Sequence, residues 1–159
     1  MKPVVKRATP AAIAVLRQAT ALFPKRNKAS DGLLPSAAHV QASPNSDHNL
    51  GLATDLTHDP KNGIDCEIIF EELKKDVRVS YLIFKGKIWS KDRRAEGNRV
   101  YTGSNPHNKH LHISIRSSHS NDTSPWFGFI DKQPSLASKA KAALSKKAKK
   151  KETPSPKEG

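Results

Sequence analysis

The sequence predicts a small α+β fold, with a central, mainly antiparallel sheet and helices packed on one of its faces. Residues 50–56 and 110–116 alternate large apolar residues with small or polar ones, as strands with one buried face do. Residues 77–84 and 87–90 flank the turn Lys85-Gly86, a pattern typical of a hairpin. Apolar residues at helical spacing lie before the first strand and again before the hairpin. The expected order is helix, strand, helix, hairpin and final strand.

The first element is expected to be a helix that ends before Pro24. Thr9 is a suitable N-cap, and Pro10 suits the first helical position. A secretory signal is the alternative, because basic residues precede an alanine-rich run, but Arg17 and Gln18 leave the apolar stretch too short. We therefore expect no signal peptide. Nothing in the sequence approaches the length of a membrane span, so no stable membrane insertion is expected.

Residues 25–47 are rich in Ser, Pro, Asn and Gly and are expected to be mostly loop. Long loops in compact domains are usually functional or disordered. Because this loop leads to His48, just before the first strand, we expect residues 32–45 to form one wall of a cleft. His39 and Gln41 are the candidate lining residues, with an ordinary surface position as the alternative for each.

A second helix is expected from Ile64 to Asp76, where Ile68, Ile69 and Leu73 recur at helical spacing. This helix should pack on the apolar face of the sheet. It contains Cys66, the single cysteine of the chain, which excludes an internal disulfide and is expected to fill apolar space.

Residues 91–108 are polar and basic and lead directly into the final strand. We expect them to form the opposite wall of the cleft, with Tyr101 and His107 nearest to the metal site that is predicted below. A solvated loop is the alternative for the arginines of this stretch. Trp126, Phe127 and Phe129 follow the last strand and are expected to seal the core.

The chain is expected to form one domain, residues 1–130, followed by a disordered basic tail, residues 131–159. Lys, Ala, Ser and Pro dominate the tail, and large apolar residues are nearly absent from it. The formal net charge of +13 indicates that the protein seeks a polyanion, which could be nucleic acid, anionic lipid or an anionic cell wall. We expect a monomer that uses the tail to hold such a polymer.

The polar face of the two strands carries residues with metal chemistry. Strand periodicity puts His110 and His112 on the face opposite Leu111, and Asp55 on the equivalent face of the first strand. His48 precedes that strand closely enough to reach the same place. Two imidazoles and one carboxylate are ligands that a catalytic zinc uses, with its fourth position open to water. Ordinary hydrogen-bonded histidines are the alternative, whereas a cupin-type site lacks its expected downstream glutamate.

These residues resemble the two signature motifs of the zinc peptidases that include lysostaphin, the D-alanyl-D-alanine metallopeptidases and the hedgehog signalling domain. Residues 46–55, Ser-Asp-His-Asn-Leu-Gly-Leu-Ala-Thr-Asp, are similar to the pattern Ser-x-His-x-x-Gly-x-Ala-x-Asp of the D-alanyl-D-alanine branch. The pair His110-x-His112 is more similar to the lysostaphin and murein endopeptidase branches. The similarity spans about Gly32 to Arg116 and extends to small phage-encoded cell-wall peptidases.

The resemblance implies that His48, Asp55 and His112 hold zinc and that His110 assists catalysis. It also implies hydrolysis of an amide bond in a peptidoglycan stem or cross-bridge peptide by a phage endolysin or virion-associated lysin. Such a protein is made in the cytoplasm of a bacterial host and acts at the cell wall after release.

The chain departs from the D-alanyl-D-alanine branch at one position. That branch carries a carboxylate three residues before its last zinc histidine, where this chain has Lys109. Counting back from His110 instead gives His107. His110 and His107 are therefore both candidate catalytic residues, and the identity of the general base stays open. Gln41 and Tyr101 are the expected substrate-binding residues.

A function from a different class remains open. A basic protein could keep this fold and use its tail to hold nucleic acid or wall polymer without catalysis. The hedgehog domain shows that the resemblance is compatible with a protein that is not an enzyme.

Overall fold

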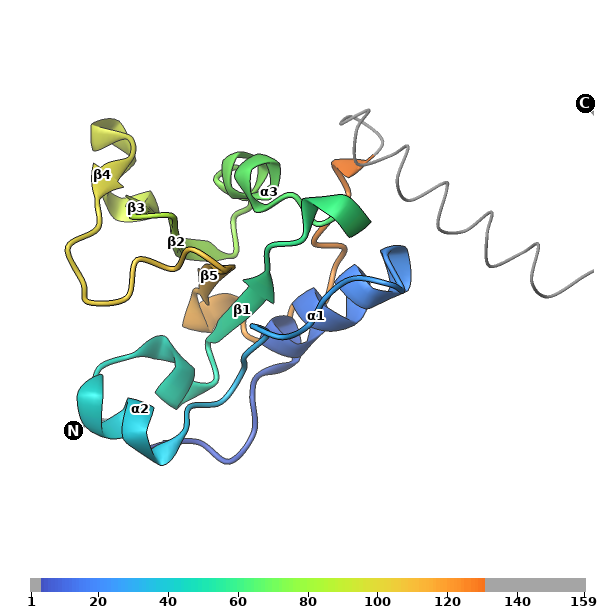
Figure 1. The fold of residues 1–159 in the computed structure, drawn as a ribbon. Coiled ribbons are helices and arrows are strands. Elements are labelled where there is room, and N and C mark those ends of the chain that lie inside the picture. Colours follow the sequence, from blue (N-terminus) through green and yellow to red (C-terminus); the bar gives the residue numbers. More distant parts are fainter. Residues whose placement is uncertain (1–3, 131–159) are drawn as a thin grey trace, which may run out of the picture.

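A five-stranded antiparallel sheet with the strand order β1-β5-β2-β3-β4 organises the chain (Figure 1). This computed structural model describes residues 4–130, so the predicted tail, residues 131–159, lies outside the described residues. The strands are β1 (Ala53–Thr57), β2 (Val79–Phe84), β3 (Lys87–Ser90), β4 (Arg99–Val100) and β5 (His110–Ile115).

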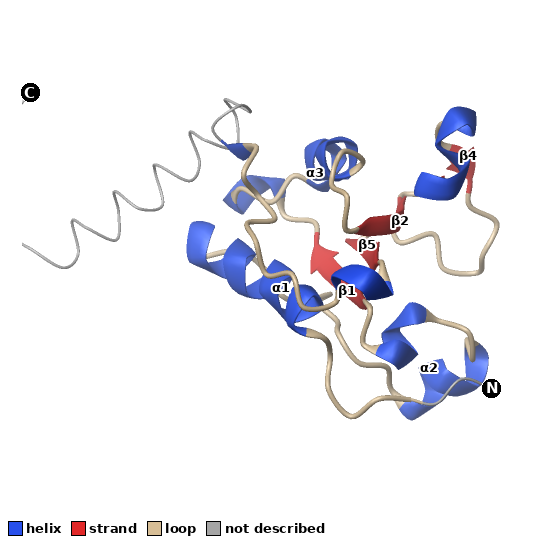
Figure 2. Cartoon of the chain, turned by 180° about the vertical axis from the view of Figure 1, so that it is seen from behind, coloured by secondary structure: helices blue, strands red, loops and turns tan. Residues whose placement is uncertain are grey.

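Among the described residues, the helices α1 (Pro10–Leu22) and α3 (Cys66–Leu73) pack against the sheet, and α2 (Ala37–Ala42) lies apart from them (Figure 2). Thr9 caps α1 by accepting from the backbone N–H of Ala12, and Pro10 occupies the first turn. Oγ1 of Thr54 donates to the carbonyl of Ala12 at 2.7 Å, which fixes α1 against β1. The predicted α+β class is confirmed.

The core lies between the apolar face of the sheet and the helices α1 and α3. Trp126 closes it, because its ring is buried and its Nε1 donates to the carbonyl of Ala11 at 3.1 Å. The guanidinium of Arg78 covers the same ring at 3.6 Å from its centroid. The largest fully buried side chains are Trp126, Phe23, Phe70, Phe84, Leu56, Ile64, Ile69, Leu73, Leu82, Leu111, Ile113 and Ile115.

Other core predictions are also confirmed. Phe127 is buried, and Phe129 packs against the core while partly buried. Cys66 is fully buried and fills apolar space, with Sγ 3.6 Å from the carbonyl oxygen of Leu56. Burial raises the pKa of this thiol far above its ordinary value.

The structure corrects several element boundaries. The first strand begins at Ala53 rather than at residue 50, because Asp47–Leu50 forms a 3₁₀ helix that ends at Gly51 with φ 70°. A β-carbon at Gly51 would come within 2.8 Å of the carbonyl oxygen of Arg7, so this turn requires glycine. The second helix is shorter than expected at both ends, and the stretches expected as loops also contain α2, a 3₁₀ helix (Lys91–Glu96) and β4.

Within residues 4–130, the helices are all too short or too polar to cross a membrane.

Candidate metal centre

Asp55 and His112 lie directly opposite each other on β1 and β5. The backbone N–H and C=O of Asp55 bond to Gly32, at 2.8 and 3.1 Å, and thus point away from β5. Asp55 and His112 therefore form a non-hydrogen-bonded pair, the kind in which facing side chains of antiparallel strands stand closest. As a result, Nδ1 of His112 lies 3.3 Å from Oδ1 of Asp55.

The segment that carries Gly32 is fixed to the outer edge of β1. Oδ1 of Asp31 accepts from the backbone N–H and the hydroxyl of Thr57, at 3.1 and 2.7 Å. Arg26 is buried and donates to both carboxylate oxygens of Asp31, at 3.0 and 2.7 Å. This network holds Gly32 against Asp55, where a β-carbon on the glycine would stand 3.1 Å from Oδ2 of the carboxylate.

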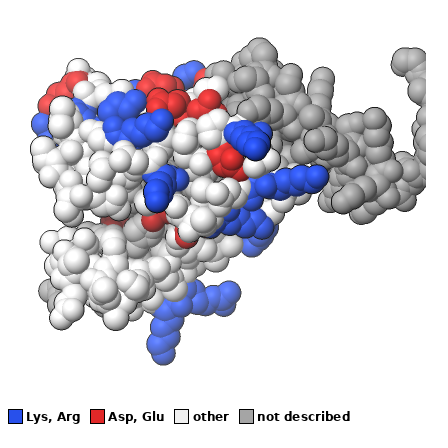
Figure 3. Space-filling model, viewed as in Figure 1, with Lys and Arg blue, Asp and Glu red and all other residues white. Residues whose placement is uncertain are grey.

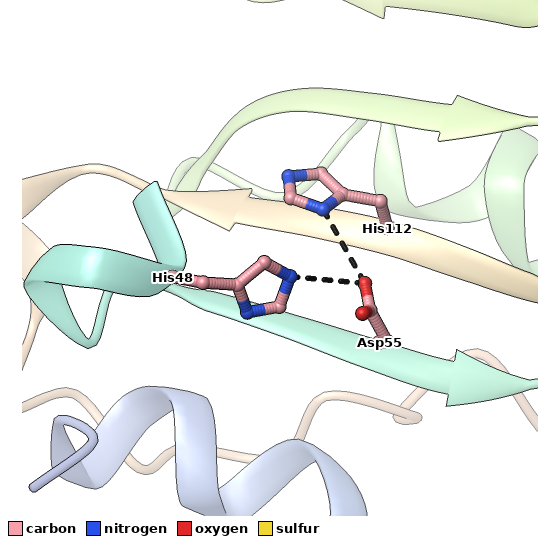
Figure 4. A group of neighbouring side chains, drawn as sticks. All are labelled: His48, Asp55 and His112. Carbon is pink, nitrogen blue, oxygen red and sulfur yellow. Dashed lines mark hydrogen bonds and ion pairs between the residues drawn. The ribbon is translucent and has the colours of Figure 1, made fainter. Parts of the chain in front are cut away.

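The 3₁₀ helix Asp47–Leu50 delivers His48 to the same carboxylate (Figure 4). Ser46 caps this helix by accepting from the backbone N–H of His48. Nδ1 of His48 is 2.8 Å from the carbonyl oxygen of Leu33, and because a carbonyl only accepts, this nitrogen carries the proton. Nε2 of His48 faces Oδ1 of Asp55, 3.2 Å away; it donates to the carboxylate when the ring is protonated and offers a lone pair to a metal when the ring is neutral.

His48, Asp55 and His112 form a group that can hold a metal ion, because their ligand atoms all lie within 4.8 Å of one another. The two measured separations, 3.2 and 3.3 Å, fit tetrahedral zinc, whose bonds of about 2.0–2.1 Å place ligand atoms about 3.3 Å apart. Two imidazoles and a carboxylate are also common ligands of other transition metals. The predicted metal triad is thus present, and its donor set fits more than one metal.

The charges of the triad also favour a cation between the three groups. Burial alone would raise the pKa of Asp55, but hydrogen bonding by His112 and His48 lowers it well below its ordinary range. Burial lowers the pKa of His48, yet Asp55 and the carbonyl of Leu33 together raise it above its ordinary value. A half-buried carboxylate that remains ionised between two imidazoles attracts either a proton or a metal ion.

The two candidate catalytic histidines lie beside the triad. Nε2 of His110 is 3.7 Å from Oδ1 of Asp55, and the ring of His107 lies 4.9 Å from that of His110 and 5.6 Å from that of His112. Burial is the largest cause that lowers the pKa of His110. Burial, followed by the nearby His112 and His110, lowers the pKa of His107 to about 4. Both rings are therefore neutral at neutral pH.

His107 is held in an unusual backbone conformation, with φ 62°. Its backbone N–H donates to Oδ1 of Asn105, and its carbonyl accepts from the N–H of Lys85 in the β2–β3 turn. Nδ1 of His107 is buried and has no hydrogen-bond partner among the described residues. A buried polar atom without a partner is costly unless a ligand completes it.

The predicted cleft walls lie on the two sides of the triad. Gly32, Leu34, Pro35, Ser36 and His39 line a cavity of about 210 Å³ together with His48 and Asp55. Figure 3 shows a groove between the surface over α2 and the surface of the loop that precedes β5. The chain segments on both sides of the groove are those predicted from the sequence.

The structure places the two predicted substrate-binding residues differently. The ring of Tyr101 lies 5.6 Å from the ring of His107, next to the site. Gln41 is exposed on α2 and is not among the residues that line the cavity. Its neighbour His39 lines the cavity instead, with its ring 5.7 Å from that of His48 and its buried Nε2 unpartnered among residues 4–130.

Sequence reasoning missed two residues that contact the triad. The ring of Tyr81 stacks on that of His112, with centroids 5.3 Å apart and an interplanar angle of 18°. Oγ of Ser114 lies 2.8 Å from Nε2 of His112. Strand periodicity does place Ser114 on the same face of β5 as His110 and His112, but it gives this serine no role at the site. Tyr81 required knowledge that β2 pairs with β5.

A sequence model of the family described as "VldE, C-terminal domain" matches residues 5–112. The matched range includes α1 and all three residues of the triad, and it ends at His112. The chain matches no curated protein and no solved structure.

Proposed function

This chain belongs to the VldE C-terminal domain family, and we propose that it acts as a zinc-dependent peptidase on the stem or cross-bridge peptides of peptidoglycan. The observation that carries the proposal is the convergence of three ligand atoms: Nε2 of His48 and Nδ1 of His112 lie 3.2 and 3.3 Å from Oδ1 of Asp55. The other ring nitrogen of each histidine has its own hydrogen-bond partner, as in metal sites with oriented imidazole ligands.

His48, Asp55 and His112 would hold the zinc. When bound there, zinc would supply Lewis acidity, which polarises a carbonyl and lowers the pKa of water so that hydroxide is available as a nucleophile at neutral pH. The protein's own residues then have to orient the peptide and to move protons. The groove between α2 and the loop before β5 offers a surface for the peptide, and His48 and Asp55 line the cavity beside α2.

His110 is the proposed proton acceptor. Its Nε2 lies 3.7 Å from Oδ1 of Asp55, and its lowered pKa keeps the ring neutral and able to take up a proton. His107 is the second candidate, because its Nδ1 is buried without a partner and its ring contacts that of His110. Lys109 occupies the position where a carboxylate stands in the D-alanyl-D-alanine branch, so the general base of that branch has no counterpart at this position.

The substrate and the biological setting rest on the resemblance to lysostaphin, D-alanyl-D-alanine metallopeptidases and phage-encoded cell-wall peptidases. In this proposal the protein is a monomeric endolysin or virion-associated lysin that reaches the wall after release from the host cytoplasm. Its formal charge of +13 favours binding to the anionic polymers of a bacterial wall.

A paired experiment tests the proposal. Metal content of the purified protein is measured by elemental analysis, and clearing of purified cell walls is followed by turbidity with and without a chelator. We expect about one zinc per chain and clearing that stops with chelator and returns with added zinc. A protein that binds zinc but leaves walls and their peptides intact would be a binding protein, which is the competing function.

A further inference from the structure

The cavity beside α2 has a size that suits part of a peptide. Two residues of the triad, His48 and Asp55, line this cavity of about 210 Å³ together with residues of the segment 32–39. A cavity of about 150 Å³ is already large enough to hold benzene, whereas pockets that take a drug-sized ligand have volumes of about 300–1,000 Å³. The cavity can therefore hold one amino-acid residue directly beside the triad, but not a longer piece of peptide.

Leu34 and Pro35 give the cavity an apolar wall. Leu34 is one of the large apolar side chains within residues 4–130 that stay exposed, with 40% of its surface accessible to solvent. An exposed leucine alone needs no explanation, but this one offers a substrate residue apolar area to remove from water. A charged side chain placed against these two residues would lose hydration without gaining a hydrogen bond from them. The wall therefore favours an uncharged, apolar residue.

The backbone before Leu34 is fixed to the triad. Gly32 exchanges two backbone hydrogen bonds with Asp55, at 2.8 and 3.1 Å. The carbonyl oxygen of Leu33 lies 2.8 Å from Nδ1 of His48. Leu34 is the next residue in the chain, so its position relative to two of the metal ligands is set by these contacts.

The helix α2, which follows Leu34 and carries another lining residue, is also held at both ends. Oγ of Ser36 accepts from the backbone N–H of His39 at 3.1 Å and caps the start of the helix. Beyond its end, Nδ2 of Asn49 donates to the carbonyls of Ser43 and Pro44, both at 3.1 Å. Asn49 is fully buried and belongs to the 3₁₀ helix that carries the first metal ligand. Both walls of the cavity are thus formed before a substrate binds.

We propose that this cavity is a substrate subsite for one uncharged, apolar residue next to the scissile bond, and that Leu34 determines which residue the subsite accepts. The inference rests on the proposed function, because it assumes that the peptide is cleaved at the triad. Leu34 is a specificity-determining residue, since it contacts the substrate side chain and takes no part in proton transfer. Preformed walls reduce the ordering that binding requires, which favours affinity.

The test uses the full chain with zinc bound and three variants. Leu34→Ala removes most of the apolar wall, and Leu34→Trp fills the cavity. Val77→Ala is the matched control, because it removes an exposed apolar side chain that lies outside the cavity, between α3 and β2. The substrates are synthetic stem peptides in which the residue on each side of the cleaved bond is varied among glycine, alanine, leucine and aspartate. Steady-state kinetics gives kcat and KM, and elemental analysis gives the zinc content.

The wild type should cleave peptides with alanine or leucine at one of the two varied positions with a kcat/KM about 10-fold or more above that for aspartate. Leu34→Ala should raise KM for these peptides by about 10-fold at nearly unchanged kcat, because the contact is equal in the ground state and the transition state. Leu34→Trp should lose the leucine peptide and keep the glycine peptide, and Val77→Ala should match the wild type. Equal KM values in Leu34→Ala and Val77→Ala would overturn the subsite and leave the peptidase function standing.

Occupation of the cavity is measured without cleavage by NMR of the leucine and valine methyl groups in the zinc-free protein. Adding the unmodified stem peptide should shift the methyl signals of Leu34 and leave those of Val77 in place. Unchanged Leu34 signals would contradict the subsite. A protein whose Leu34 signals shift, but which binds zinc and cleaves none of the peptides, would keep the binding subsite and lose the peptidase function, so the two failures can be told apart.

Discussion

The backbone of Gly32 pairs with that of Asp55, and a β-carbon at Gly32 would stand 3.1 Å from Oδ2 of the Asp55 carboxylate. A larger residue here must push the carboxylate or lift the pairing segment from β1. We expect Gly32→Val to weaken zinc binding by about 10-fold or more, measured by chelator competition, through loss of ligand positioning. Gly128→Ala is the control, because a β-carbon at Gly128 would meet no atom within 4 Å. Equal affinities for both variants would show that the space beside Asp55 is unimportant.

Removing any ligand should largely abolish metal binding. His48→Ala, Asp55→Ala and His112→Ala each take away one of three converging ligands, and two ligands hold zinc far more weakly than three. Elemental analysis after dialysis should find little zinc in these variants. His119→Ala, which changes a histidine away from the triad, should keep wild-type zinc content. Full occupancy in all three triad variants would exclude this site.

The proposed proton acceptor can be separated from the ligands. His110→Ala should keep its zinc while the rate of peptide cleavage falls roughly 10²- to 10⁴-fold, the effect of losing a positioned acid-base group. Zinc content and cleavage of a soluble wall peptide are measured on the same preparation. Loss of zinc would make His110 a ligand.

The companion variant is His107→Ala. Its unpartnered Nδ1 and its contact with the ring of His110 make it the other group able to accept a proton. We expect a smaller loss of rate than for His110→Ala, with zinc retained. A larger loss would transfer the proton-acceptor role to His107.

Acid should destabilise the fold through His58. Nδ1 of His58 accepts from the backbone N–H of Cys66 at the start of α3, and burial, followed by the charge of Lys85, lowers the pKa of this ring below 6.5. Because the pKa is lower in the folded than in the unfolded chain, stability is complete above about pH 6.5 and declines as the pH falls toward the folded value.

Urea unfolding of the metal-free protein at neutral and acidic pH measures this effect. His58→Gln replaces the ring with a neutral side chain, so the variant should lose less stability than the wild type over the same interval. Identical pH dependence in the two proteins would remove His58 from the explanation.

The basic tail, residues 131–159, should act on binding to the wall and not on the chemistry. Deletion of residues 133–159 should leave zinc content and cleavage of small soluble peptides unchanged. Clearing of intact walls should become slower and less sensitive to salt, because lysines attract an anionic polymer through a screened interaction. Undiminished wall activity at low salt would direct attention to nucleic acid as the partner.

Strand periodicity was enough to predict which face of β1 and of β5 carries the site residues. A period of two puts His110 and His112 on one face of β5, and the apolar pattern puts Asp55 on the matching face of β1. It could not find the 3₁₀ helix that holds His48, because that helix is one turn long and depends on the left-handed conformation of Gly51. The sequence also does not predict which way the side chains of residues 25–47, the expected loop, point.

For this reason Gln41 was predicted as a substrate-binding residue, although it lies exposed on α2. The short helix α2 turns His39 toward the cavity and leaves Gln41 exposed, a difference that depends on a helix not expected from the sequence. Tyr81 was missed for another reason. Its contact with His112 exists only because β2 lies next to β5, and strand order is a property of the whole fold.

The segment that positions Asp55 also protects the edge of the sheet. β1 is an edge strand, and edge strands with free backbone groups recruit strands from other molecules and lead to aggregation. Here Gly32 occupies the outward N–H and C=O of Asp55, and Asp31 occupies the outward N–H of Thr57. The opposite edge, β4, is only two residues long. Within residues 4–130, neither edge of the sheet offers a long template for a second chain, which disfavours intermolecular sheet formation.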